Sequence, residues 1–136
     1  GAGSAERPVS RRSRRRSERA GRRAEWIAAW FLRFKGYRIL ARRCRTPAGE
    51  IDIIARRGRL LAFVEVKHRT DPAVGLAAVS PRQQQRIIRA AGWFISGHPD
   101  FAAFCLRFDV ILTAELGWPC HTVAAFQPET GKNRLP

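Results

Sequence analysis

The stretch GEIDIIARRGRLLAFVEVK (residues 49–67) constrains the fold more than any other part of the chain. Two mainly apolar segments, residues 50–56 and 60–68, flank the dipeptide Gly58-Arg59. Alternating side chains are typical of β-strands, and glycine in the first turn position suits a type II′ turn. The stretch therefore predicts a β-hairpin. Three charged residues interrupt its apolar run: Asp52, Glu65 and Lys67.

The turn determines which side chains share a face, because successive residues of a strand point to opposite sides. A Gly58-Arg59 turn places Asp52 opposite Glu65 and Glu50 opposite Lys67. An Arg57-Gly58 turn slips the pairing by two residues and leaves both faces unchanged. In either case one face is uniformly apolar and is expected to pack on helices (Ile51, Ile53, Ala55, Ala62, Val64, Val66). The other face carries the charged residues, with Ile54 and Phe63 beyond them.

The facing carboxylates indicate a metal site. Directly opposed residues have Cβ atoms about 5 Å apart, so two carboxylates repel unless a proton or a cation lies between them. Mg²⁺ or Mn²⁺ takes oxygen ligands from one or two carboxylates, water and a substrate phosphate. Lys67 shares the face of Glu65, where it can orient an attacking water or offset charge on the phosphate. The alternative is that this face is simply the solvent side of an antiparallel sheet.

The rest of the chain predicts two helices and three further strands. Apolar residues recur at three- and four-residue spacing over 17–35, and Gly36 stands at a C-terminal cap position. A second helix is expected from Ser80-Pro81 to about residue 96, with Gln83 completing a capping box. The further strands are expected at residues 37–45, 104–113 and 120–126.

Length and charge suit one basic domain. We expect residues 1–16 to be a disordered basic tail that opens with an expression remnant (residues 1–4), residues 17–127 to form a single domain, and residues 128–136 to fray. The net charge is +15. Since only about half of it lies in residues 1–23, a nucleic-acid partner is favoured over an arginine-rich solvated surface. No run of residues is apolar enough to span a bilayer, so no membrane partner is expected.

Two groups of arginines are candidates for phosphate contacts. The first is in the tail (Arg14, Arg15, Arg16), and the second lies just before the hairpin (Arg42, Arg43, Arg45). Four tryptophans could stack on bases. Because apolar residues surround them, we interpret them as core residues (Trp26, Trp30, Trp93, Trp118). Arg107 and Asp109 share a strand face and are interpreted as a structural ion pair.

The motif G-E-I-D-I-I-A (residues 49–55), followed by F-V-E-V-K-x-R (residues 63–69), resembles the bacterial YraN family. That family is related to the PD-(D/E)XK nucleases and their Holliday-junction resolvases. Lys35-Gly36-Tyr37 and Arg107-Phe108-Asp109-Val110 extend the resemblance over residues 21–126. It implies an α/β fold with a restriction-endonuclease-like α-β-β-β-α-β core, a mixed central sheet flanked by helices. It also implies a metal held by Asp52, Glu65 and the main-chain carbonyl of Val66, with Lys67 catalytic.

The resemblance implies two supporting residues from the helices. Glu25 matches an acid that related nucleases add from the first helix; the alternative is a surface glutamate. Gln84 is interpreted as lining the site rather than as a structural amide, since it shares a helix face with Ile87 and Ile88. The chain departs from the pattern at Gln83, where a basic residue is common, and at Arg43, where an asparagine is expected.

The sequence thus predicts a nuclease that uses Mg²⁺ or Mn²⁺ to cut DNA, with branched or flapped structures as favoured substrates. A non-catalytic nucleic-acid-binding protein on the same fold is the alternative. A homodimer is left open, because resolvases cut symmetric junctions as dimers. Three widely spaced cysteines predict free thiols and a cytoplasmic location (Cys44, Cys105, Cys120).

Overall fold

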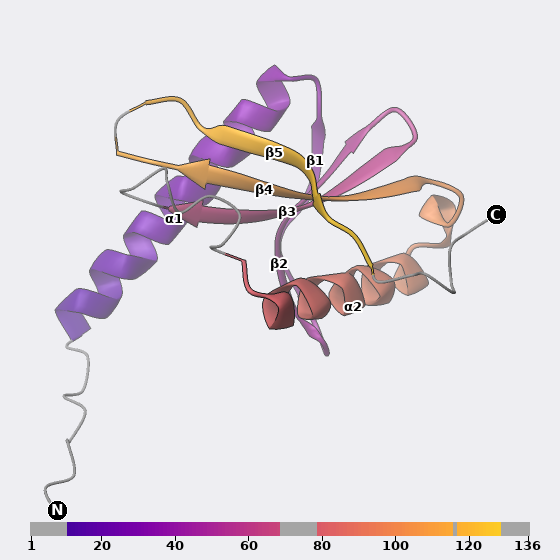
Figure 1. The fold of residues 1–136 in the computed structure, drawn as a ribbon, viewed down its shortest axis with the longest axis horizontal. Helices are drawn as coiled ribbons and strands as arrows, with labels where there is room; N and C mark the ends of the chain where they lie inside the picture. Colours follow the sequence, from indigo (N-terminus) through magenta and orange to yellow (C-terminus); the bar gives the residue numbers. More distant parts are fainter. Residues whose placement is uncertain (1–10, 69–78, 116, 129–136) are drawn as a thin grey trace, which may run out of the picture.

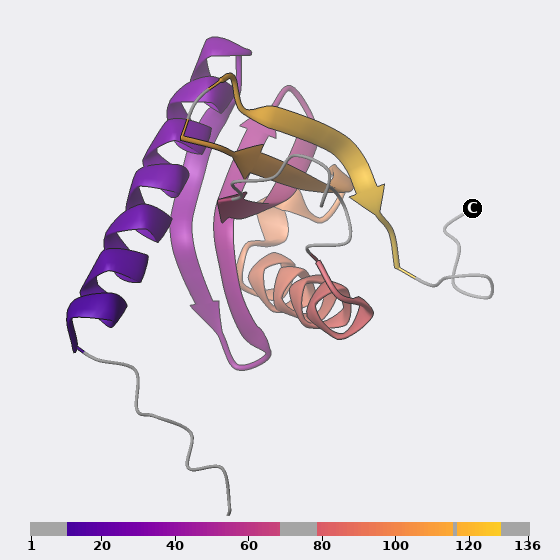
Figure 2. The same cartoon turned by 60° about the vertical axis from the view of Figure 1, so that its left-hand side comes forward.

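The structure is a computed structural model that describes the backbone of residues 11–68, 79–115 and 117–128, and their side chains except those of 11–18 and 20. It is an α/β fold with one five-stranded mixed sheet, in the order β1-β2-β3-β4-β5 (Figure 1). Strands β3 and β4 pair parallel, and the other neighbours pair antiparallel. Helix α1 covers one face of the sheet and helix α2 covers the other (Figure 2). The predicted fold class is confirmed.

The elements follow the predicted order, and most bounds agree within two residues. They are α1 (Arg11–Phe34), β1 (Arg38–Thr46), β2 (Gly49–Arg57), β3 (Leu60–His68), α2 (Pro81–Gly97), the short 3-10 helix η2 (Pro99–Phe101), β4 (Cys105–Thr113) and β5 (Cys120–Phe126). The exception is α1, which begins at Arg11 although residues up to 16 were predicted to be disordered. Arginine is a good helix former, and neither glycine nor proline interrupts residues 11–20, so the helix extends through them. Residues 1–10 and 129–136 of the predicted tails lie outside the described residues.

The C-terminus of α1 is closed by a Schellman motif, as the glycine predicted. The Gly36 N–H donates to the carbonyl of Arg33, and the Tyr37 N–H donates to the carbonyl of Leu32. Gly36 has φ of 93°, which a residue with a Cβ rarely adopts. Tyr37 and Leu32 are both buried, so the motif also fixes the direction in which the chain enters β1.

The hairpin of β2 and β3 has the predicted turn. Pairs run from Ile53↔Val64 to Arg57↔Leu60, which leaves Gly58-Arg59 as the two-residue loop. Gly58 has φ of 61°, whereas Arg59 does not have a positive φ, as a type II′ turn requires. The register assumed from the sequence is therefore confirmed for these pairs.

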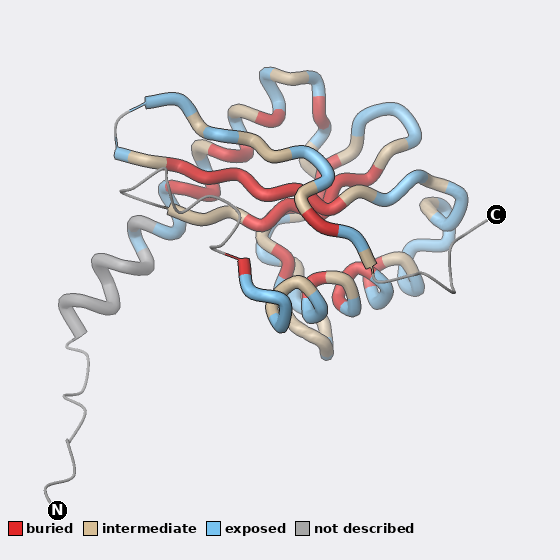
Figure 3. Tube along the Cα trace, viewed as in Figure 1, coloured by how far each residue is buried: buried red, intermediate tan, exposed pale blue. Residues whose placement is uncertain are grey.

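Two apolar cores occupy the two faces of the sheet, and the central strands are buried along much of their length (Figure 3). The core under α1 contains the predicted apolar face (Ile53, Ala55, Ala62, Val64, with Val66 at its margin). The core under α2 contains Ile54 and Phe63, so the face that carries Asp52 and Glu65 is not the solvent side. Ile51 was predicted beside Ile53 but packs in the core under α2, and it lies beyond Ile53, where the pairing of β2 with β3 ends.

The interpretation of the tryptophans as core residues is wrong. Trp26, Trp30 and Trp93 are more than half exposed, and Trp118 is 86% exposed. The small apolar residues of α1 fill its buried face instead (Ala24, Ala28, Ala29, Leu32). Within the described part of the chain, no helix combines the length and apolar character needed to span a bilayer.

Candidate functional site

Asp52 and Glu65 lie where β2 and β3 stop pairing. The paired residues of β2 and β3 end at Ile53↔Val64. At the next position the side chain of Asp52, and not the backbone of β2, accepts the hydrogen bond from β3. Its Oδ2 accepts a hydrogen bond of 2.8 Å from the backbone N–H of Val66. The predicted pairing of Glu50 with Lys67 is not formed. Glu50 is exposed and lies 3.9 Å from Arg45, so it takes no part in the site.

The two carboxyl groups share one electrostatic environment. Glu65 is only 6% exposed, and its pKa is raised to about 8, first by burial and then by repulsion from Asp52. The nearby Lys67 ammonium opposes this rise without cancelling it. Burial also raises the pKa of Asp52, and Glu25 adds repulsion. At neutral pH the pair therefore holds a proton on Glu65, in a place where a cation could take over its role.

Lys67 and one glutamine of α2 meet at the same oxygen of Glu65. The Nζ of Lys67 lies 3.4 Å from Oε1, and the Nε2 of Gln83 donates a 2.8 Å hydrogen bond to it. Both donors therefore act on one oxygen of Glu65.

The site glutamine is Gln83, and the prediction of Gln84 is wrong. The Nε2 of Gln84 donates to the carbonyl of Val79, which makes it a structural amide at the start of the helix. Ser80 caps α2 as predicted by accepting the N–H of Gln83. The Gln83 side chain reaches Glu65 rather than turning back to the cap, so only half of the expected capping box forms. Adjacent helix residues point about 100° apart, so Gln83 and Gln84 contact different parts of the protein.

Glu25 reaches inward from α1, as the resemblance implied. It is 7% exposed, and its Oε2 accepts a 2.7 Å hydrogen bond from the Nε of Arg43. Its Oε1 is buried and has no hydrogen-bond partner among the described residues. Arg43 has φ of 52°, a left-handed conformation that is uncommon for residues other than glycine. A strained arginine therefore holds the third acid beside the pair.

Asp52 and Glu65 offer the carboxylate oxygens that Mg²⁺ or Mn²⁺ takes as ligands. Across residues 19–68, 79–115 and 117–128, no three His, Cys, Asp or Glu side chains are grouped closely enough to hold a metal ion. Mg²⁺ needs fewer protein ligands, because it keeps several waters and binds through one or two carboxylates plus a substrate phosphate. Asp52 and Glu65 fit that requirement, and the unpartnered oxygen of Glu25 is available nearby.

The arginines predicted to bind phosphate do not lie together in the structure. Arg42 and Arg43 line a pocket of about 440 Å³ together with Arg22 and Trp26, which we call the arginine pocket. Arg45 is exposed and turns toward Glu50 instead. The side chains of Arg14, Arg15 and Arg16 lie outside the described residues, although their backbone is helical.

A second buried acid is surrounded by partners that the sequence only partly predicted. Arg107 donates to both oxygens of Asp109, which confirms the ion pair. His121 also contacts this acid: its Nε2 lies 2.8 Å from Asp109 and its Nδ1 lies 2.7 Å from the Lys35 ammonium. An ammonium can only donate, so Nδ1 accepts and Nε2 donates to Asp109. His121 pairs with Ile111, so it lies diagonally across from Asp109 on the same face of the β4–β5 pair, a contact that depends on strand pairing and not on residue spacing.

The fold and these side chains define a small α/β protein that carries a cluster of buried carboxylates where two strands of a mixed sheet separate. Residues 24–113 match the family described as "Uncharacterised protein family UPF0102". A UPF0102 protein of Bradyrhizobium diazoefficiens is 52% identical over 128 residues, which cover 94% of this chain and 96% of that one. A UPF0102 protein of Parvibaculum lavamentivorans is 51% identical over 106 residues (78% and 80%). The chain therefore belongs to the UPF0102 family.

Proposed function

We propose that this protein is a metal-dependent nuclease that hydrolyses phosphodiester bonds in DNA, as the resemblance to the YraN family and the PD-(D/E)XK nucleases implies. The observation that carries the proposal is the buried Glu65 with the half-buried Asp52 next to it and Lys67 beside them. Two acids this close to each other and this far from water destabilise the free protein unless their charge serves a ligand. A divalent cation bridging to a phosphate is the ligand that suits them.

Each residue has a role that follows from its position. A bound Mg²⁺ or Mn²⁺ would supply Lewis-acid stabilisation of charge on the phosphate. Asp52 and Glu65 would hold it, and the hydrogen bond from the Val66 amide fixes one oxygen of Asp52. Lys67, 3.4 Å from Glu65, is positioned to orient water or to offset negative charge. Gln83 orients Glu65, and Glu25 offers its free oxygen.

The proposal includes a cytoplasmic setting, in keeping with three free cysteines. DNA is the favoured polymer, and a homodimer remains a prediction. Branched or flapped DNA is proposed as the substrate from the resemblance to resolvases.

Cleavage of end-labelled single strands, duplexes, flaps and four-way junctions tests the proposal, with Mg²⁺, Mn²⁺ or EDTA. We expect metal-dependent products that fall at least about 100-fold in Asp52→Ala and in Lys67→Ala. Glu50→Ala is the matched control, since Glu50 is an exposed acid of the same strand. Cleavage that persists in EDTA, or in Asp52→Ala, would contradict the assignment.

A second function is a nucleic-acid-binding protein that keeps the fold without cutting. It is favoured by the ion pair between Arg43 and Glu25, because this pair neutralises the third acid without a metal. In that case the same assay would detect salt-sensitive binding, with no products in any metal and no effect of Lys67→Ala on affinity.

A further inference from the structure

The exposed tryptophans of α1 lie beside the arginine pocket. Trp26 and Trp30 are 56% and 54% exposed and meet edge to face, with 6.2 Å between ring centroids. Arg33 lies over the Trp30 ring at 5.2 Å. Large apolar side chains gathered on a surface mark binding sites, so these tryptophans form a candidate binding site.

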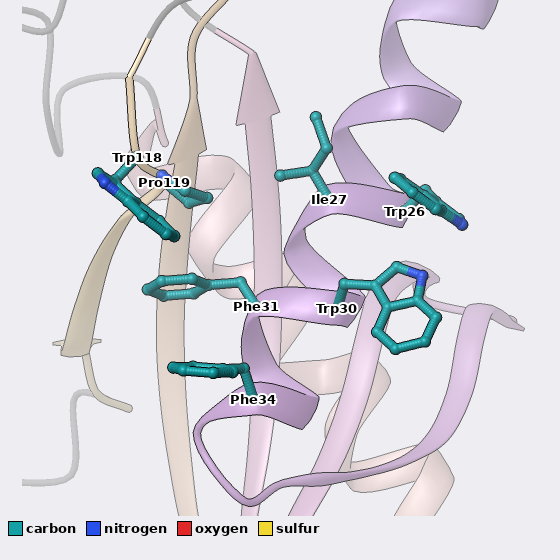
Figure 4. Close-up of a pocket in the computed structure, with 7 residues that line it drawn as sticks. All are labelled: Trp26, Ile27, Trp30, Phe31, Phe34, Trp118 and Pro119. Carbon is teal, nitrogen blue, oxygen red and sulfur yellow. The ribbon is translucent and has the colours of Figure 1, made fainter.

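An aromatic groove continues from these two rings. It has a volume of about 350 Å³ and an almost wholly apolar lining (Trp26, Ile27, Trp30, Phe31, Phe34, Trp118, Pro119). Figure 4 shows Phe31 and Phe34 extending from α1 toward Trp118 and Pro119, with Trp26 and Trp30 on the other side of the helix. Phe34 and Trp118 are almost fully exposed, so the groove is open to a ligand.

Trp26 lines both the aromatic groove and the arginine pocket. Arg43 of that pocket also contacts Glu25, whose charge acts on Asp52. Trp26 thus joins the aromatic groove and the arginine pocket into one surface, and Arg43 connects this surface to the carboxylate cluster.

We propose that this surface binds a single-stranded segment of nucleic acid, with bases stacked on Trp26 and Trp30 and phosphates in the arginine pocket. Unpaired bases expose faces on which aromatic side chains stack, whereas duplex bases are already stacked on one another. The phosphate chain then leads past Arg43 toward the acids. The position of the cut rests on the proposed nuclease function, but the binding does not.

Charge favours this occupant over a second copy of the chain. The net charge of +15 makes two copies repel, and arginines border the tryptophans. A nucleic acid complements both features, because its phosphates attract arginines and its flat bases stack on tryptophans within one short stretch.

Binding is measured in EDTA by fluorescence anisotropy, with a labelled oligothymidylate of about 20 nucleotides and a duplex of the same length. We expect the single strand to bind more tightly. Trp26→Ala and Trp30→Ala should each weaken it between about 5-fold and 100-fold, whereas Trp26→Phe retains most of the affinity. Trp93→Ala is the matched control, because Trp93 is equally exposed (54%) but lies on α2. Arg42→Gln should lower the slope of affinity against salt by about one phosphate contact.

Several results would overturn the proposal: no binding, a preference for the duplex, or affinities that Trp26→Ala and Trp30→Ala leave unchanged. If those variants instead dissociate a dimer in sedimentation without changing affinity, the groove is an interface between copies. The two proposals fail separately. Tight single-strand binding without cleavage in Mg²⁺ would support the binding surface and contradict the nuclease. Cleavage that neither tryptophan substitution changes would support the nuclease and contradict the binding surface.

Discussion

Two buried acids on neighbouring strands, Asp109 of β4 and Glu65 of β3, have opposite electrostatic surroundings. Burial alone would raise the pKa of Asp109, but hydrogen bonds from His121, Arg107 and the Ala124 amide lower it to about 2. The pKa of Glu65 is instead raised to about 8, because its buried neighbour is another acid and Lys67 offsets this only in part. The surroundings of Asp109 therefore favour its charged form, whereas those of Glu65 favour its protonated form.

The difference separates a structural acid, Asp109, from a candidate ligand-binding acid, Glu65. Asp109 lies among donors from β4 and β5, so its charge stabilises the folded protein. The Asp52–Glu65 pair destabilises the metal-free protein, and a site that destabilises its own fold is expected to bind something. Isosteric substitutions at the two places test whether this contrast is real.

The largest expected effect is on stability, from Asp109→Asn compared with Asp52→Asn in EDTA near pH 7. Asp109→Asn leaves the guanidinium of Arg107, which is only 16% exposed, without its partner and should lower the free energy of unfolding by about 3 kcal/mol. Asp52→Asn removes a repulsive charge but keeps an oxygen for the Val66 amide. Its stability should change by less than about 1 kcal/mol or rise. Urea unfolding midpoints measure both, and equal losses would erase the contrast.

An intermediate effect is expected from pH. The folded pKa of Glu65, about 8, exceeds its ordinary value of 4.5, so the folded protein binds this proton more tightly than the unfolded chain. The resulting stability is complete below pH 4.5 and is lost as the pH rises through about 8. Asp109 behaves in the opposite way: its contribution is present above 3.8 and is lost as the pH falls through about 2.

Thermal unfolding of the metal-free protein between about pH 5 and pH 9 measures this loss, which should reach roughly 2–4 kcal/mol. Glu65→Gln should flatten the curve, because the amide cannot ionise. The proposed Mg²⁺ would displace this proton, so adding Mg²⁺ should protect the wild-type protein most at the alkaline end. A wild-type curve as flat as that of Glu65→Gln would mean that Glu65 titrates normally.

The sequence predicted those features that depend on local patterns. The hairpin register followed from Gly58 and the alternation of faces, and the end of α1 followed from Gly36. Each of these rests on geometry within one element or one turn, which a single sequence contains.

The failures concern residues whose roles depend on other elements. The tryptophans look like core residues in sequence, but alanines of α1 allow the helix to approach the sheet closely and leave the large rings outside. Ile51 packs under α2 rather than beside Ile53, because it lies beyond the point where β2 and β3 stop pairing. The contact of His121 with Asp109 depends on how β5 pairs with β4. None of these has a signature in residue spacing.

The smallest effect distinguishes two neighbouring glutamines, Gln83 and Gln84. Gln83→Ala removes the hydrogen bond to Glu65 and should weaken cleavage or Mg²⁺ affinity by about 10-fold, with little change in stability. Gln84→Ala removes the bond to Val79 and should lower stability by about 1 kcal/mol without changing cleavage. Calorimetric titration of Mg²⁺ and urea unfolding separate the two effects. The opposite pattern would mean that Gln84 faces the acids, because only one of two adjacent helix positions can do so.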